Sequence, residues 1–295
     1  MASSSASFGV STHIFHGDRL ERRHIEQIAA HGFDLVELFA TRTHLDYHDA
    51  RAVADVRSWL HDCGVAAASM HAPITVGFTG GVWGRAYSNA STNAVERQEA
   101  IDETRRSIDA ARALGCSALV LHLGIPRGQP IGAGDNDVAS LKRSLEPIAE
   151  ACTIAGVRLA LEVIPNDLAT PEALLQWLDG DLELGAAAVC LDFGHAHLVG
   201  GAPEAAEMLA GYVITTHVHD NRGVSDDHLL PFEGTIDWPA TIAAMSKIGY
   251  AGPWIFELPD HGHVERTLAG AVSARRRIQA ILDDSARPFD FSEPA

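Results

Sequence analysis

Short apolar segments recur along the chain, and most of them are too short to form helices. They are bounded by Gly, Pro or Asp and are apolar on both alternating faces, which is typical of parallel strands covered on both sides. Eight segments have this character: 8–11 (FGVS), 35–39 (LVELF), 65–70 (VAAASM), 118–124 (ALVLHLG), 158–163 (RLALEV), 187–194 (AAVCLDFG), 212–220 (YVITTHVHD) and 254–258 (WIFEL).

Amphipathic segments with helical periodicity lie between these predicted strands. In residues 20–32 the apolar side chains recur at helical spacing, and the segment stops at Gly32, a suitable residue for the position after a helix. In another segment Asp237 is a suitable N-cap and Pro239 lies just inside the start. The pattern predicts helices over 20–32, 49–64, 94–115, 140–156 and 237–249.

The strand–helix alternation repeats eight times between residues 8 and 282, which favours a single (β/α)8 TIM barrel of the α/β class as one domain. A doubly wound sheet is disfavoured because no GxGxxG phosphate loop occurs in the chain. The connections 72–93 and 124–139 are long and Gly-rich, and we expect them to cover the catalytic face as lids or substrate walls. Residues 1–7 and 283–295 are expected to be loosely ordered termini.

The composition restricts the class of protein further. The chain has 295 residues, with 22 Lys and Arg against 39 Asp and Glu, and a net charge of −17. Nucleic-acid binding is not expected, because affinity for the phosphate backbone comes from Lys and Arg. The four cysteines are scattered, the N-terminus lacks the pattern of a signal peptide, and no apolar run approaches the length of a membrane span. We therefore expect a cytoplasmic protein that does not enter a membrane.

Histidine is unusually frequent, with 16 residues, and many histidines and acids fall at the ends of predicted strands. Chemistry in a TIM barrel lies at the C-terminal ends of the strands. The residues at these ends are His13, Glu37, His71, His122, Glu162, Asp192, His195, His217, His219 and Glu257. Carboxylates that converge there repel one another unless a cation lies between them, so the pattern predicts a divalent-metal site. Imidazole and carboxylate ligands without a thiolate suit Zn²⁺, Mn²⁺, Co²⁺ or Fe²⁺.

Five other histidines fall on predicted helices or loops away from the strand ends, and we expect them to be solvated. They are His24, His31, His44, His48 and His61.

Four stretches of the chain resemble the xylose-isomerase-like TIM-barrel superfamily: 160–166 (ALEVIPN), 190–197 (CLDFGHAH), 216–223 (THVHDNRG) and 226–258. The last stretch combines a D-x-H, the sequence E-G-T-I-D-W, a G-Y-x-G-P and a strand that ends in Glu257. This combination is typical of the sugar phosphate isomerase/epimerase branch, which is related to endonuclease IV. The resemblance covers roughly residues 8–282, although the first four strands match only by pattern.

The resemblance implies that Glu162, Asp192, His217 and Glu257 hold a divalent metal ion, with Mn²⁺, Zn²⁺, Co²⁺ or Mg²⁺ as the ions expected. His217 is preferred over His219 because the family motif H-x-(K/N)-D fits the segment from His217 to Asp220. In the endonuclease IV branch further ligands complete a three-zinc cluster. The residues at those places are His71, His122, His195, Asp226 and His228, so one metal site is expected and up to three are implied.

The resemblance also implies an enzyme, a metal-dependent sugar or sugar-phosphate isomerase or epimerase of carbohydrate metabolism. Glu162 and Glu257 would transfer the proton through an enediolate that the metal stabilises. The substrate-binding residues expected from the resemblance are His13, His195, His219 and Arg222, and Phe15, Trp83 and Phe193 are candidates to line the apolar face of the sugar. An endonuclease IV-like multi-zinc phosphodiester hydrolase, or a related lyase or dehydratase, is the alternative. We expect a small sugar-type substrate; homo-oligomers are usual in the resembling family, and the sequence leaves the oligomeric state open.

Overall fold

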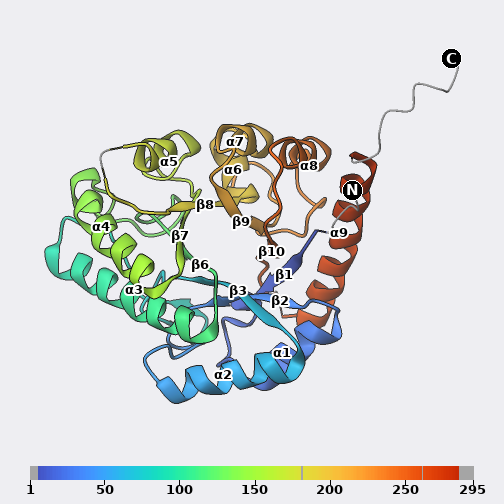
Figure 1. The fold of residues 1–295 in the computed structure, drawn as a ribbon, viewed down its shortest axis with the longest axis horizontal. Helices are drawn as coiled ribbons and strands as arrows, with labels where there is room; N and C mark the ends of the chain where they lie inside the picture. Colours follow the sequence, from blue (N-terminus) through green and yellow to red (C-terminus); the bar gives the residue numbers. More distant parts are fainter. Residues whose placement is uncertain (1–5, 181, 261, 286–295) are drawn as a thin grey trace, which may run out of the picture.

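The eight predicted strands form one closed parallel barrel in the computed structural model, which describes residues 6–180, 182–260 and 262–285 (Figure 1). Around the barrel the strands follow the order β1-β10-β9-β8-β7-β6-β3-β2. Their bounds are β1 Phe8–Ser11, β2 Leu35–Phe39, β3 Ala66–His71, β6 Ala118–Leu121, β7 Arg158–Glu162, β8 Ala188–Asp192, β9 Val213–Val218 and β10 Trp254–Phe256. The predicted TIM barrel of the α/β class is therefore confirmed.

The helices surround the barrel and begin and end where the sequence contains capping residues. Gly64, Gly115 and Gly156 end three helices in the left-handed conformation that glycine adopts without strain. The Asp237 side chain accepts the Ala240 backbone N–H at the start of α8, as predicted. The helices are η1 Thr12–Phe15, α1 Arg22–Ala30, α2 Ala50–Cys63, α3 Ala94–Leu114, α4 Val138–Ala155, α5 Pro171–Leu178, α6 Phe193–Val199, α7 Ala202–Met208, α8 Trp238–Lys247 and α9 Val264–Ser285.

Side chains inside the barrel change character along the strands. Ala118, Val120, Ala160 and Cys190 form a small buried cluster in the interior. Side chains two residues apart on a strand point to the same face, so Glu162 and Asp192 lie one level nearer the C-terminal end than Ala160 and Cys190. The interior is therefore filled by small side chains below and by charged side chains at the end where a TIM barrel carries its chemistry.

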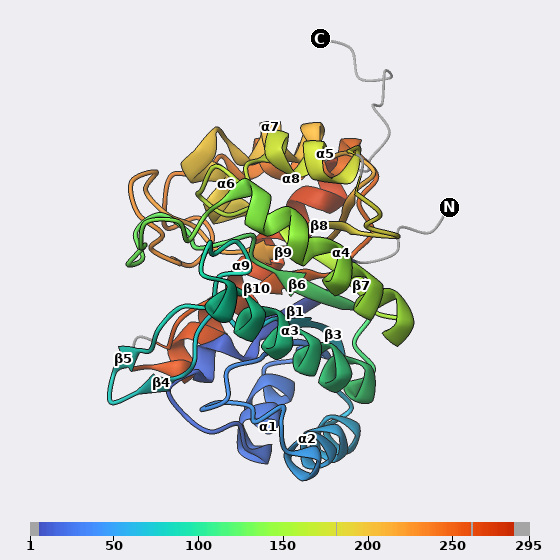
Figure 2. The ribbon, with the colours of Figure 1, turned by 90° about the vertical axis from the view of Figure 1, so that its left-hand side faces the viewer.

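The two long connections lie against each other at this end of the barrel. The 72–93 connection contains the hairpin β4 Phe78–Thr79 and β5 Val82–Trp83. Thr92 N–H donates to the carbonyl of Gly134, and Asp137 N–H donates to that of Ala90. Figure 2 shows the hairpin on the same side of the barrel as the loops that follow β6 and β9. This placement fits the walls or lids that their length predicts.

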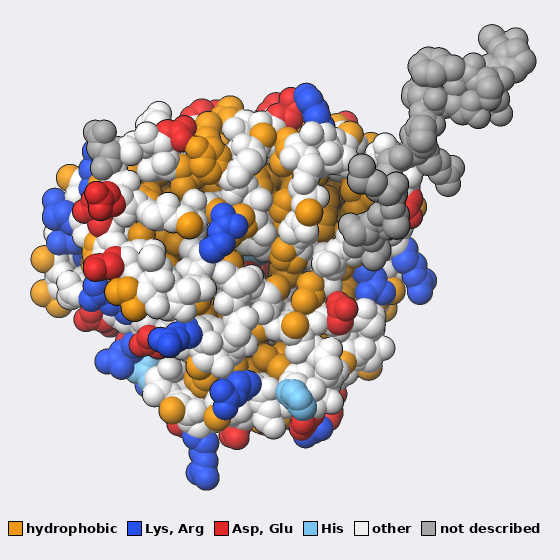
Figure 3. All heavy atoms as spheres, viewed as in Figure 1, with side chains coloured by type: hydrophobic (Ala, Val, Ile, Leu, Met, Phe, Trp, Pro, Cys, Tyr) orange, Lys and Arg blue, Asp and Glu red, His pale blue; other side chains and the backbone are white. Residues whose placement is uncertain are grey.

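Charged side chains of both signs are interspersed on the face drawn in Figure 3. The net charge of −17 is therefore not concentrated in one acidic area of that face. Within the described ranges, no helix combines the length and the apolar character needed to cross a bilayer.

Most of the segments expected to be loosely ordered, 1–5 and 286–295, lie outside the described residues. Residues 283–285 complete α9, so for these three residues the prediction is wrong. The prediction that His24 and His44 are solvated is wrong, since their exposed fractions are 3% and 0%. Each buried ring has a backbone hydrogen-bond partner: His24 Nδ1 accepts the N–H of Glu21, and His44 Nδ1 donates to the carbonyl of Asp18, which is distant in sequence.

Burial of His44 makes the stability of the fold depend on pH. Burial lowers the pKa of His44 from 6.5 to about 4, so between these values the unfolded chain binds the proton more readily. Stability from the neutral ring is fully present above pH 6.5 and is lost as the pH falls toward 4, by about 3 kcal/mol at 1.36 kcal/mol per pH unit. We expect His44→Asn to remove that part of the pH dependence in urea unfolding at pH 4–7. His61→Asn, at a ring 88% exposed, is the control, and equal pH dependence in both variants would contradict the assignment.

Candidate active site

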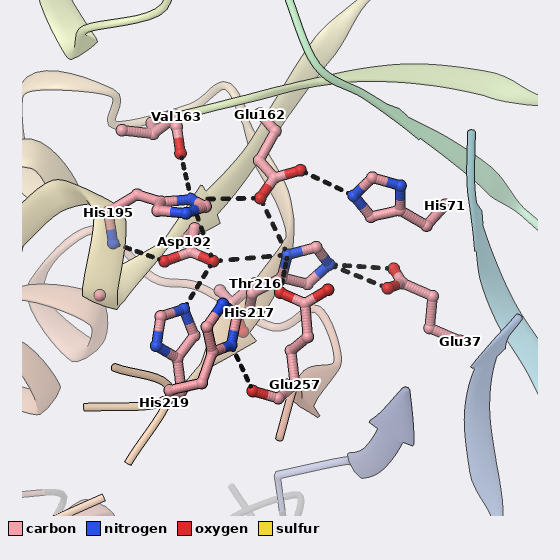
Figure 4. Close-up of polar contacts among 12 residues, drawn as sticks. Glu37, His71, Glu162, Val163, Asp192, His195, Thr216, His217, His219 and Glu257 are labelled. Atoms are coloured by element: carbon pink, nitrogen blue, oxygen red, sulfur yellow. Dashed lines mark hydrogen bonds and ion pairs between the residues drawn. The ribbon is translucent and has the colours of Figure 1, made fainter. Parts of the chain in front are cut away.

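Three carboxylates and one imidazole converge at the C-terminal ends of four neighbouring strands (Figure 4). Glu162, Asp192, His217 and Glu257 are all buried, and one ligand atom from each lies within 4.8 Å of the others. His217 Nδ1 is 3.1 Å from Glu162 Oε1, 3.3 Å from Glu257 Oε2 and 3.6 Å from Asp192 Oδ2. The barrel thus brings together the four residues predicted to hold one metal ion.

Glu162 also belongs to a second group of potential ligands. Its Oε2 atom is 3.1 Å from His71 Nε2 and 3.0 Å from His122 Nε2. Because its Oε1 faces His217, the Glu162 carboxylate bridges the two groups.

A third group combines His195, at the start of α6, with Asp226 and His228 of the loop that follows β9. Asp226 Oδ2 is 3.1 Å from Nε2 of both His195 and His228. His228 has a φ of +45°, which non-glycine residues rarely adopt, and this conformation turns its ring toward Asp226. All five residues predicted as additional ligands are therefore found in groups of three beside the first group.

Strong pKa shifts accompany this crowding. Burial alone would raise the pKa of Glu162, but the charges of His122 and His217 outweigh it and hold that pKa well below its usual range. Burial alone would lower the pKa of His71, but the hydrogen bond to Glu162 and the charges of the surrounding glutamates together outweigh it and raise the pKa to about 9. For His228, burial is likewise outweighed by the charge and hydrogen bond of Asp226 together with the charges of nearby acids, which raise the pKa to about 10. In the absence of a cation, protons on the imidazoles balance the carboxylates.

The donor set fits divalent cations. Every ion pair recorded for Glu162, Asp192, Asp226 and Glu257 in the described chain is with a histidine, and none is with Lys or Arg. Three histidine rings are held by Nδ1–H donation to a backbone carbonyl: His71 to Ala72, His195 to Val163 and His228 to Glu257. Their Nε2 atoms are thereby aimed at the carboxylates, an orientation common among metal-binding histidines. Imidazole and carboxylate groups in this arrangement suit Zn²⁺, Mn²⁺ or Co²⁺.

A cavity of about 290 Å³ opens above these groups. Its floor includes His71, His122, His195, Asp226, His228 and Glu257. Its walls are largely aromatic and apolar, with His13, Phe39, Ile74, Trp83, Ile125 and Pro259 among them. Trp83 from the hairpin stacks on His16 with ring centroids 4.7 Å apart, and His16 stacks on His13 at 4.8 Å. The cavity therefore combines a polar floor with flat, largely apolar walls.

Only some of the predicted substrate-binding residues line the cavity. His13 and His195 line the cavity, whereas His219 is fully buried beneath it. Arg222 is exposed and is not among the residues that line the cavity. Of the aromatic candidates, Trp83 lines the cavity, Phe193 packs against Trp238 and Trp254, and Phe15 stacks on His24.

His217 and His219 point to the same side of β9 but have different surroundings. His217 lies among Glu162, Asp192 and Glu257, whereas His219 donates from Nε2 to Asp192 at 2.9 Å and stacks on His228. A side chain at Gly194 would overlap the His219 ring, so the glycine after Phe193 is needed for this packing. The structure therefore places His217, rather than His219, in the group of four potential ligands.

Two residues of the site carried no assigned role in the sequence. Glu37 was visible only as a strand-end acid, and the structure pairs it with His217 at 3.0 Å. His16 follows His13 in a 3-10 helix and contributes to the aromatic wall. The alternation in LVELF could have flagged Glu37, because it places this acid on the face opposite Val36 and Leu38.

Asp220 explains why the segment 226–238 has so characteristic a sequence. Its buried carboxylate accepts hydrogen bonds from Phe232 N–H, Ile236 N–H and the Trp238 indole N–H, and its backbone pairs with Leu229. A Cβ at Gly234 would overlap this carboxylate, which accounts for the glycine in E-G-T-I-D-W. Much of the recognisable motif thus shapes the loop that carries Asp226 and His228.

Replacing Asp220 with alanine is expected to lower the free energy of unfolding by about 3 kcal/mol, because it leaves buried N–H donors without an acceptor. Urea unfolding would measure the change. Asp237→Ala, which removes an exposed helix cap, is the control and is expected to cost about 1 kcal/mol. Equal losses in the two variants would refute this role of Asp220.

Comparison with known proteins agrees with this architecture. The family model described as a xylose isomerase-like TIM barrel matches residues 25–281. The chain is 30% identical over 257 residues to the uncharacterized protein MJ1311 of Methanocaldococcus jannaschii, which covers 83% of this chain and 81% of that protein. It is 31% identical over 194 residues to the uncharacterized protein y4fM of Sinorhizobium fredii, a match that spans 63% of this chain and 60% of that protein.

Solved structures with the same fold include sugar epimerases. A D-tagatose 3-epimerase-like protein superimposes with a TM-score of 0.77 and 25% identity, over 95% of this chain and 100% of that one. An L-ribulose 3-epimerase gives a TM-score of 0.73 at 18% identity, over 98% of this chain and 100% of that one. A D-psicose 3-epimerase crystallised in the presence of D-fructose gives 0.72 at 18% identity, over 94% and 99%. At 18% identity, the latter two matches show a shared fold and nothing more.

Proposed function

Because the chain belongs to the xylose isomerase-like TIM-barrel family, we propose that it is a divalent-metal-dependent sugar epimerase or isomerase. The observation that carries this proposal is the group of Glu162, Asp192, His217 and Glu257 at the base of a cavity of sugar-like size. The likeness to a D-tagatose 3-epimerase-like protein supports the reaction class.

Glu162, Asp192, His217 and Glu257 would hold the principal metal ion, which supplies Lewis-acid polarisation of neighbouring substrate oxygens when bound. Mn²⁺, Zn²⁺, Co²⁺ and Mg²⁺ are the candidate ions. His71 with His122, and Asp226 with His195 and His228, would hold up to two more. Charge supports more than one ion, because Glu37, Glu162, Asp192, Asp226 and Glu257 together carry five negative charges when ionised.

The proposed proton-transfer groups are two glutamates of the principal ligand group. Glu257 lines the cavity, so it can take a proton from a substrate carbon and return one. Glu162 is fully buried among four imidazoles, and as the second acid or base it would act from beneath the substrate. Return of the proton to the opposite face of the same carbon gives epimerisation, and return to the adjacent carbon gives isomerisation.

The cavity indicates how a sugar would lie. Hydroxyl groups would face the polar floor, and an apolar C–H face would lie against Trp83 and the other wall residues. His13 can bind a hydroxyl group, because its ring lines the cavity and burial lowers its pKa well below the usual value, which keeps the ring neutral. His195 would contact the substrate from the floor, and His219 would act by holding Asp192. Arg222 is left out of this arrangement because of its exposed position.

An exchange experiment tests the proposal. Protein loaded with Mn²⁺ or Co²⁺ would be incubated in D2O with free ketohexoses and with their phosphates. We expect interconversion of two sugars together with incorporation of solvent deuterium at the reacting carbon. If none of these sugars shows interconversion or deuterium exchange, the proposal is contradicted.

A multi-metal phosphodiester hydrolase is the second candidate, and the sharing of Glu162 between two ligand groups favours it. The net charge, and the absence of Lys and Arg from the described residues that line the cavity, favour a small sugar over a nucleic acid. Three bound ions together with hydrolysis of bis-p-nitrophenyl phosphate would establish the hydrolase instead.

A further inference from the structure

Glu37 is a buried carboxylate at the centre of the barrel that has no part in the ligand groups described above. It lies on β2 with an exposed fraction of 0%, and it is not among the residues that line the cavity. Glu37 contacts Ser69 and His217, so we look for a role that acts through another residue.

The contacts of Glu37 are few and specific. Its Oε2 accepts a hydrogen bond from Ser69 Oγ at 2.8 Å, and both carboxylate oxygens lie 3.0–3.1 Å from His217 Nε2. A buried carboxylate is costly unless donors satisfy it, and an ionised carboxylate can only accept. The Glu37 site therefore requires a proton on Nε2 of His217.

The His217 ring connects Glu37 to the ligand group. Nε2 faces Glu37 from one edge of the ring, and Nδ1 faces Glu162, Asp192 and Glu257 from the other (Figure 4). A neutral imidazole has one N–H and one lone pair. Since Glu37 holds the proton on Nε2, it is Nδ1, the nitrogen that faces the carboxylates, that would give up its proton and offer a lone pair to a bound cation.

The hydrogen-bond partner that holds the His217 ring differs from the partners of the other histidines at the site. His71, His195 and His228 donate from Nδ1 to a neutral backbone carbonyl, whereas His217 donates from Nε2 to a charged carboxylate. A carboxylate partner fixes the tautomer and raises the basicity of the ring more than a carbonyl does. The Nδ1 atom of His217 is thus oriented to bind a cation through its lone pair.

We propose that Glu37 is a positioning residue that fixes the tautomer and orientation of His217 and thereby sets the affinity of the site for a divalent cation. This inference rests on the metal site of the proposed function but concerns metal binding alone, so it can be tested without a substrate. Ser69 has the secondary role of orienting the Glu37 carboxylate.

The experiment compares Glu37→Gln, Ser69→Ala and the unaltered protein in competition titrations of Co²⁺ and Zn²⁺ against a chromophoric chelator. Removing a carboxylate partner of a metal-binding histidine typically weakens affinity about 10–100-fold, and we expect that range for Glu37→Gln. Ser69→Ala removes one neutral hydrogen bond and is expected to weaken affinity on the order of fivefold. The Co²⁺ absorption spectrum of Glu37→Gln should also shift, because the donor strength of His217 changes.

Glu103→Gln is the matched control. Glu103 is a buried glutamate on α3 that accepts hydrogen bonds from Tyr47 Oη at 2.6 Å and from His48 Nε2 at 2.8 Å, and it does not line the cavity. The Glu103→Gln substitution should leave metal affinity and the Co²⁺ spectrum unchanged, even if it lowers stability as much as Glu37→Gln does.

The outcomes separate the inference from the proposed function. Affinity within twofold of the unaltered protein in Glu37→Gln overturns the role of Glu37 while leaving the metal site intact. If Glu37→Gln does not fold, unchanged affinity in Ser69→Ala overturns it. An equal loss of affinity in Glu103→Gln also overturns it, because the effect would then be one of general stability. If the unaltered protein binds no divalent cation, both proposals fail.

Discussion

Replacing Glu257 with glutamine is expected to lower kcat by about 1,000-fold on any sugar that the unaltered protein interconverts. The amide has nearly the same shape as the carboxylate but cannot accept a proton, and positioned acid–base groups typically contribute 10²–10⁴-fold to the rate. Glu257 is the one carboxylate of the principal ligand group that lines the cavity. The measurement is the rate of sugar interconversion, together with deuterium incorporation from D2O.

Glu257 is also a potential metal ligand, so the metal content of the variant must be measured beside its rate. A rate loss in a variant that still binds the metal assigns proton transfer to Glu257, whereas a loss that excess metal restores assigns it only a ligand role. Glu265→Gln, at a glutamate on α9 with 69% exposure, is the matched control and should keep full activity. Unchanged turnover in Glu257→Gln would rule out its acid–base role.

Removal of divalent metal by a chelator is expected to abolish activity and to lower the melting temperature by roughly 10 °C. A ligand present at 1,000 times its Kd stabilises the folded state by about 4 kcal/mol. For proteins of 150–250 residues, each kcal/mol of stabilisation raises the melting temperature by about 2–4 °C, and the shift is slightly smaller in a larger protein such as this one. Calorimetry before and after chelation, and after addition of Mn²⁺ or Co²⁺, would measure the shift. A metal-free protein with full activity would contradict the proposed mechanism.

Metal analysis of two variants decides how many ions the site holds. Asp192→Asn changes the group of four ligands, whereas Asp226→Asn changes only the group with His195 and His228. With a single ion, Asp226→Asn should retain it and Asp192→Asn should lose it. With three ions, each variant should lose part of the bound metal, which would strengthen the hydrolase alternative.

The fold was predictable because its signals are local. Each strand is a short apolar run, and each of α2, α3 and α4 ends at a glycine in the left-handed conformation. The convergence of strand-end residues was also predictable, since parallel strands in a barrel present their C-terminal ends to one opening. Exposure was less predictable, because His44 lies in a loop and is nevertheless fully buried by contacts distant in sequence.

By itself, the sequence determined that this chain folds as a barrel with acids and imidazoles at one end, because periodicity and strand direction are properties of adjacent residues. The tertiary structure decided which of these groups meet: that His217 rather than His219 joins the three carboxylates, that Glu162 is shared, that Arg222 stays outside, and that Glu37 holds His217. The physical reason is distance. Ligation and hydrogen bonding depend on separations of about 3 Å between residues such as Glu37 and His217, and only closure of the barrel sets those separations.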